Sequence, residues 1–101
     1  MEMSEVKRKV YKDNEMFQAR LEEVGDVLFI HIQVKQMKKK TIDTLLDEFP
    51  TFKEKIKTAG YKFLHTYSAT PKFYQMFKGY EEVGDMDWEG KSYKVLRWDL
   101  K

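Results

Sequence analysis

The chain has 101 residues, of which 42% are hydrophobic and 15% aromatic, and this composition predicts a single folded domain over 1–101 rather than a disordered chain. Nineteen Lys and Arg against seventeen Asp and Glu give a formal charge of +2, too small for the total charge to predict nucleic-acid binding. No cysteine is present, which excludes a disulfide framework and a thiolate metal site. No apolar run reaches the ~20 residues that cross a membrane. We therefore expect a soluble, cytoplasmic protein without membrane contact.

The first third of the sequence predicts three strands joined by two hairpin turns. The strands span 6–11, 16–24 and 27–34, with turn signals at 13–14 and 25–26. In the third strand the even positions are all apolar, whereas the odd positions combine Val27 and Phe29 with His31 and Gln33. This period of two predicts one fully buried face and one partly polar face.

Helical spacing follows over 42–59. The apolar residues recur at intervals of three, four and seven, and they are Ile42, Leu45, Leu46, Phe49, Phe52 and Ile56. Thr41 is the predicted N-cap, and Gly60 can end the helix in the left-handed conformation. Because Pro50 removes one backbone donor and crowds the preceding turn, we expect a kink or two abutting helices.

The remaining sequence predicts three more strands and one short helix. The strands span 61–67, 80–86 and 92–100, and a turn at 89–90 separates the last two. Thr70 and Pro71 begin the short helix, which Gly79 ends, and its apolar stripe consists of Phe73, Met76 and Phe77. The order is therefore β-β-β-α-β-α-β-β, an α+β (α/β-like) fold with a mixed twisted sheet.

Two passages carry a family resemblance. A basic loop at 35–41 joins the third strand to the long helix, and the segment 73–84 reads F-Y-Q-M-F-K-G-Y-E-E-V-G. With the order of elements over 28–100, about three quarters of the chain, these passages resemble the core of the GNAT superfamily of N-acetyltransferases. The resemblance implies a reduced version of that acyl-CoA N-acyltransferase fold, without the first strand and two helices that form one wall of the acceptor site in full-length members.

The resemblance also implies a set of site residues. Lys38, Lys39, Lys40 and Thr41 correspond to the loop that contacts the pyrophosphate of acetyl-CoA, and Tyr74 corresponds to the general acid that protonates the leaving thiolate. The family's loop has the pattern R/Q-x-x-G-x-G/A, whose glycines let the phosphates approach backbone N–H groups. The segment 38–43 contains no glycine, so bulky side chains are expected to crowd these groups and Asp43 to repel an anion.

The two histidines allow further interpretations. His31 lies on the mixed face of its strand, where it could act as a general base or simply form a hydrogen bond at the sheet surface. His65 alternates with Phe63 and Tyr67, which is typical of a hydrogen-bonded, partly buried histidine. Because the two histidines lack the spacing of a metal-binding motif, we predict no metal site.

Exposed basic and aromatic side chains suggest two kinds of macromolecular partner. The patch 35–40 could bind nucleic-acid phosphates, with bases stacking on Tyr61, Tyr67, Tyr74 and Trp88. Alternatively, a partner protein or a second copy could bind an apolar surface formed by Phe77, Tyr80, Met86, Trp88 and Trp98.

We expect a noncatalytic GNAT-like binding or structural module that acts through protein contacts and needs no cofactor. The resemblance extends to short phage-encoded members, which implies a virion-associated or host-modulating role in the host cytoplasm or the virion. Two alternatives remain open: a small acyl-CoA-dependent N-acetyltransferase, which would use acetyl-CoA, and a nucleic-acid-binding domain.

Overall fold

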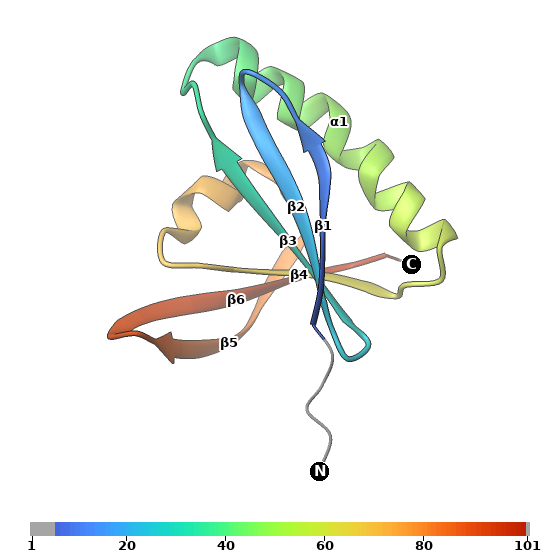
Figure 1. The fold of residues 1–101 in the computed structure, drawn as a ribbon, viewed down its shortest axis with the longest axis vertical. Coiled ribbons are helices and arrows are strands. Elements are labelled where there is room, and N and C mark those ends of the chain that lie inside the picture. The colour runs from blue at the N-terminus through green and yellow to red at the C-terminus, as the bar shows by residue number, and fades with distance from the viewer. Residues whose placement is uncertain (1–5, 101) are drawn as a thin grey trace.

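The computed structural model describes residues 6–100, and six strands in this range form one mixed sheet in the order β1-β2-β3-β4-β6-β5 (Figure 1). The elements are β1 (Val6–Asp13), β2 (Phe17–Val24), β3 (Val27–Val34), α1 (Lys39–Thr58), β4 (Phe63–Ser68), the 3-10 helix η1 (Pro71–Met76), β5 (Tyr80–Trp88) and β6 (Lys91–Asp99). The predicted α+β class and order of elements are confirmed. Residues 1–5 and 101 of the predicted domain lie outside the described residues.

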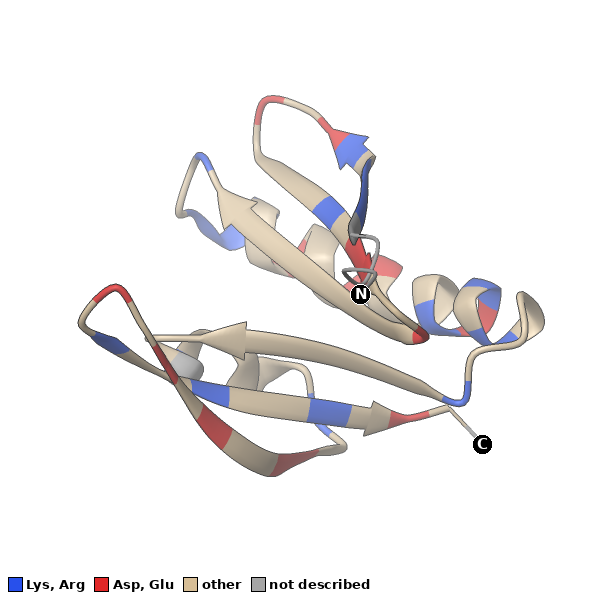
Figure 2. Cartoon of the chain, turned by 60° about the horizontal axis from the view of Figure 1, so that its bottom comes forward, with Lys and Arg blue, Asp and Glu red and all other residues tan. Residues whose placement is uncertain are grey.

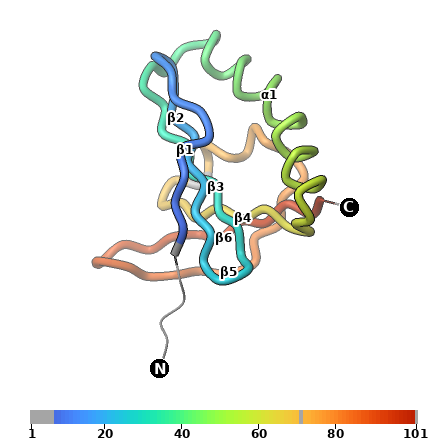
Figure 3. Tube along the Cα trace, turned by 45° about the vertical axis from the view of Figure 1, so that its right-hand side comes forward, coloured from blue at the N-terminus to red at the C-terminus, as the bar shows by residue number. Residues whose placement is uncertain are grey.

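β3 and β4 are parallel neighbours that separate after a single register pair. Phe29 lies opposite His65, and the described register contains no further pair between these strands. Inside the core, the hydroxyl of Thr66 donates a hydrogen bond of 2.6 Å to the carbonyl of Ile30. Beyond these contacts, β1–β3 turn away from β4, β6 and β5 (Figures 1 and 3). We call this divergence of β3 from β4 the fork.

The hydrophobic core lies on one face of the sheet, where both helices pack. The ring centroid of Phe49 on α1 is 4.6 Å from that of Phe77, which follows η1, and 5.2 Å from that of Trp98 on β6. In β3, Leu28 and Ile30 are buried, whereas Ile32 and Val34 on the same face are half-buried, so the predicted full burial of this face is confirmed only for the first half of the strand. The odd positions of β3 belong to the opposite face, which we call the open face.

The first helix begins and ends with different kinds of cap. Its N-cap is Lys38, which makes no side-chain capping bond, so the prediction that Thr41 caps the helix is wrong: Thr41 lies inside the first turn and is buried. At the other end, Gly60 has φ +103°. The N–H of Gly60 bonds the carbonyl of Lys57 and the next N–H bonds that of Ile56, a Schellman motif that confirms the predicted role of Gly60.

Pro50 neither ends α1 nor divides it, because it lies inside a single helix of 20 residues. The expectation of two abutting helices is therefore wrong. Proline removes the donor for the carbonyl four residues earlier, that of Leu46. Because Pro50 and Leu46 are both exposed, water can replace the missing donor.

The apolar surface predicted for partner binding is not a continuous exposed patch. Phe77 and Trp98 are core residues, with 2% and 1% of their surface exposed. Trp98 occupies a core-facing position of β6, and its indole N–H donates a bond of 3.2 Å to the carbonyl of Phe77. Tyr80 and Met86 are half-buried, which leaves Trp88, 56% exposed, as the large aromatic residue of the set that solvent reaches.

The two outer strands of the sheet differ in charge. Lys7, Arg8 and Lys9 lie on β1, whereas Glu81, Glu82, Asp85 and Asp87 lie on β5, whose acidic residues stand beside basic residues of β6 (Figure 2). Two of these acids form ion pairs with β6, Asp85 with Lys94 at 2.7 Å and Glu81 with Arg97 at 3.4 Å. Among the described residues, no helix is long and apolar enough to cross a membrane.

Replacing Thr66 by Val is expected to lower the free energy of unfolding by about 1–3 kcal/mol, because the buried hydrogen bond to Ile30 is lost while the shape is retained. The matched control is Thr44→Val, since the Thr44 hydroxyl makes the same kind of bond, to Lys40, at the exposed surface of α1. Urea denaturation measures both changes. Equal effects of the two substitutions would contradict a role of Thr66 in closing the fork.

Candidate functional site

Tyr74 approaches the fork from the core face. Its side chain is 5% exposed and packs against Phe73 and Trp98, with ring centroids 5.0 and 6.2 Å away. Burial raises the pKa of Tyr74, and hydrogen bonding to the Thr66 side chain and the Ile32 backbone offsets part of that rise. These two partners belong to β4 and β3, so the phenol oxygen lies between the diverging strands. At neutral pH the phenol is protonated and can donate its proton.

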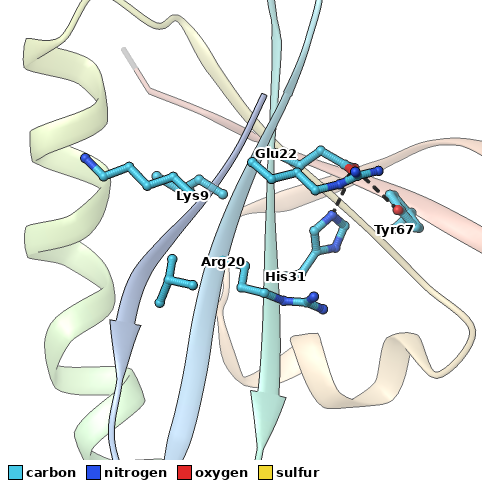
Figure 4. Close-up of a pocket in the computed structure, with 8 residues that line it drawn as sticks. Lys9, Arg20, Glu22, His31 and Tyr67 are labelled. Carbon is cyan, nitrogen blue, oxygen red and sulfur yellow. Dashed lines mark hydrogen bonds and ion pairs between the residues drawn. The ribbon is translucent and has the colours of Figure 1, made fainter. Parts of the chain in front are cut away.

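On the open face, the side chain of Glu22 links three residues from three other strands. Its carboxylate accepts a hydrogen bond of 3.4 Å from the hydroxyl of Tyr67 on β4, and it lies 3.3 Å from Nε2 of His31 on β3 (Figure 4). Arg8 on β1 donates to the other carboxylate oxygen at 3.0 Å. The rings of His31 and Tyr67 meet edge to face, with centroids 4.7 Å apart, and so face each other across the fork.

The pKa shifts in this cluster determine where its protons lie. Burial lowers the pKa of His31, and the hydrogen bond with Glu22 only partly offsets this effect. Burial raises the pKa of Glu22, but hydrogen bonds from His31 and Arg8 outweigh it and leave the pKa below its ordinary value. At neutral pH, Glu22 is therefore a carboxylate and His31 is neutral. Because a carboxylate only accepts, Nε2 of His31 carries the proton and Nδ1 is left as an acceptor.

A pocket opens beside this cluster on the open face. Its volume is about 330 Å³, and its lining includes Arg8, Arg20, Glu22, His31 and Tyr67. Arg20 lies directly opposite His31 in the β2–β3 pairing. In Figure 4, the Arg20 side chain runs below the His31 ring, whereas Lys9 points away from it toward α1. The pocket and Tyr74 thus lie on opposite faces of the fork.

The head of α1 follows β3 through a short basic turn and can attract an anion. Lys38, Lys39 and Lys40 are exposed, and the first turn holds no acid. Lys39 is 90% exposed and forms an ion pair with Asp43 one turn further along, at 3.0 Å. Its side chain therefore leans along the helix, away from the first N–H groups, and it neutralises Asp43. This ion pair offsets part of the repulsion expected from Asp43, and the crowding expected from the lysine side chains stays a prediction.

Thr41 provides a second observation at the head of α1. Its hydroxyl is buried and has no hydrogen-bond partner in the part of the chain that the structure describes. Unpaired N–H groups at a helix N-terminus, flanked by lysines, form a general site for phosphate groups. The residues present therefore fit a phosphate-bearing ligand, although none of the glycines typical of such loops is there.

The nucleic-acid alternative loses part of its predicted surface. Tyr74 is buried, so it cannot stack on a base, and the exposed Trp88 lies on the acidic strand β5. The hydroxyls of Tyr61 and Tyr67 bond to Glu23 and Glu22, which places carboxylates beside both rings. These four aromatic residues do not form one basic, exposed surface. No group of three or more His, Asp or Glu residues that could hold a metal ion occurs in 6–100.

The sequence identified His31 and Tyr74, but it did not identify Glu22, Arg20 and Tyr67 as their neighbours. The sequence did contain a signal that would have placed Glu22 and Arg20 near His31. The predicted turn at 25–26 sets Val24 opposite Val27, and counting back along the hairpin then places Arg20 opposite His31. Tyr67 carried no such signal, because its position depends on the register of two parallel strands that are distant in sequence.

Comparison with known proteins supports the fold. No protein-family model and no curated protein sequence matches the chain. Among solved structures, an acetyltransferase from Bacillus cereus ATCC 14579 is 21% identical with a TM-score of 0.59, and the match covers 94% of this chain and 73% of that one. A spermidine N-acetyltransferase chimera from Vibrio cholerae and hSSAT is 13% identical with a TM-score of 0.60, covering 94% and 68%.

A third solved structure, a Bacillus subtilis acetyltransferase in complex with CoA, is 13% identical with a TM-score of 0.51, and the match covers 96% of this chain and 100% of that one. At these identities the likeness concerns the fold alone. The chain therefore has the fold of the GNAT acetyltransferases, as the sequence resemblance predicted.

Proposed function

We propose that the chain binds acyl-CoA at the fork and transfers the acyl group to a small amine. The observation that carries this proposal is the placement of a proton donor and a proton acceptor on the two faces of one fork. Tyr74 reaches the strands from the core face, and His31, held by Glu22, faces the pocket on the open face. An acyl group held between β3 and β4 would have one of them on each side.

The head of α1 would hold the phosphates of the ligand. Lys38 and Lys40 supply charge, and the helix N-terminus supplies N–H donors. The Bacillus subtilis acetyltransferase in complex with CoA is covered over 100% of its length by this chain. In that protein, CoA binding therefore needs no segment beyond the part that matches this chain.

The protons of the reaction can be assigned to named atoms. Bound acyl-CoA would supply an acyl group activated as a thioester. His31 takes a proton from the attacking amine at Nδ1, while Glu22 fixes the ring through Nε2. As the carbon–nitrogen bond forms and the carbon–sulfur bond breaks, Tyr74 gives its phenolic proton to the departing sulfur. Solvent returns a proton from His31 to Tyr74, so the products are an amide and free CoA.

The noncatalytic role predicted from the sequence stays a prediction, and so do its phage-related setting and its protein partners. It differs from the acyl-transfer proposal in one measurable respect, because a module that acts only through protein contacts needs no affinity for CoA. Measuring CoA binding directly therefore separates the two functions.

Isothermal titration calorimetry with acetyl-CoA is expected to give saturable binding. Lys40→Glu is expected to raise the dissociation constant about tenfold or more, because it places a negative charge at the helix N-terminus beside the phosphates. The control Lys91→Glu makes the same change of charge at an exposed residue in the β5–β6 hairpin and is expected to leave binding unchanged. An absence of heat at millimolar acetyl-CoA would overturn the proposed function.

Tyr74→Phe is expected to lower the turnover number for CoA release about 10²–10⁴-fold and to leave the dissociation constant of acetyl-CoA nearly unchanged, because it removes only the proton donor. Thiol release from acetyl-CoA in the presence of an amine measures turnover. Tyr80→Phe is the matched control, since Tyr80 is a half-buried tyrosine that packs on Trp98, 5.8 Å between ring centroids. Similar losses in both variants would show that Tyr74 acts only in packing.

A further inference from the structure

The pocket on the open face carries more positive charge than its own acid can neutralise. Glu22 already accepts hydrogen bonds from Arg8 and Tyr67 and contacts His31. Its charge is therefore matched within the cluster. Arg20 also lines the pocket; it is exposed, and none of the ion pairs among residues 6–100 includes it. A guanidinium without a partner beside a cavity is a ready contact for a carboxylate or another planar anion.

The position of Arg20 relative to His31 allows one small ligand to contact both side chains. The two residues lie directly opposite each other on β2 and β3, on the same face of the sheet. In antiparallel strands, the Cβ atoms of such a pair lie about 4.5–5.5 Å apart. A single small ligand can therefore reach both side chains at once. A pocket of about 330 Å³ lies within the range for small ligands.

We propose that the acceptor is a small amine that also carries a carboxylate, with the chemistry of an α-amino acid. This inference rests on the proposed acyl transfer at the fork. The Arg20 guanidinium binds the carboxylate, and the amino group, one carbon away, faces His31. The site thereby selects the acceptor by its negative group and positions its nitrogen toward the fork.

The same charges disfavour polyamines. A polycation would place an ammonium group beside Arg20 and Arg8, while Glu22 is already engaged by Arg8. One of the proteins with this fold is a spermidine N-acetyltransferase chimera, at 13% identity. The charge of the pocket therefore predicts that this chain selects a different class of acceptor from that protein.

The test compares L-norvaline with n-butylamine, which is the same molecule without its carboxylate, and with spermidine. Amide chemical shifts of the full ¹⁵N-labelled chain, titrated without acyl-CoA at low salt, measure binding. L-norvaline is expected to bind about tenfold or more tightly than n-butylamine and to shift the amides of Arg20 and His31. Arg20→Gln is expected to abolish this preference. Arg97→Gln is expected to keep it, because Arg97 pairs with Glu81 outside the pocket.

Three results would overturn the acceptor class: equal or tighter binding of n-butylamine or spermidine, an unchanged preference in Arg20→Gln, or no saturable binding of L-norvaline at tens of millimolar. Thiol release from acetyl-CoA separates this outcome from failure of the proposed function. If L-norvaline binds at Arg20 but releases no CoA, the carboxylate site stands and acyl transfer falls. If all three amines release CoA equally, transfer stands and the acceptor class falls.

Discussion

The parallel pairing of β3 with β4 is the constraint on which the rest of the structure depends. Two parallel strands need a crossover connection, and α1 supplies it on the core face. In the described register the two strands pair at Phe29 and His65, and the Thr66–Ile30 hydrogen bond adds a buried contact nearby. Past that point, β1–β3 diverge from β4, β6 and β5. At the resulting fork, side chains from both faces of the sheet lie close to the same gap.

The fork explains why chemistry-bearing side chains gather from distant parts of the sequence. Tyr74 and His31 are separated in the chain by α1 and β4, but each lies beside the strands where they diverge. Burial raises the pKa of Tyr74 and lowers the pKa of His31, because it disfavours the charged form of each group. The phenol therefore stays protonated and the imidazole stays neutral. One is thereby suited to give a proton and the other to accept one. The head of α1 adds positive charge at the end of β3.

Much of the fold could be predicted because its signals are local. Alternation in 27–34 identified the buried face of β3, and Gly60 marked the end of α1. The errors arose where tertiary contacts determine whether a residue is buried and which residues lie beside it. Trp98 was expected at a surface, yet its position on β6 faces the core and its indole N–H finds a carbonyl there. Thr41 resembled an N-cap, but α1 begins earlier, at Lys39. Tyr67 could not be placed beside His31, because the register of parallel strands has no turn to fix it.

The location of the ligand is the most direct test of this account. Titration of the ¹⁵N-labelled chain with acetyl-CoA, followed by amide chemical shifts, reports which residues the ligand approaches. The account predicts the largest shifts at Ile32 on β3, at Lys40 and Thr41 in the first turn of α1, and at Tyr74. Shifts confined to the β5–β6 hairpin, or no shifts at millimolar acetyl-CoA, would contradict it.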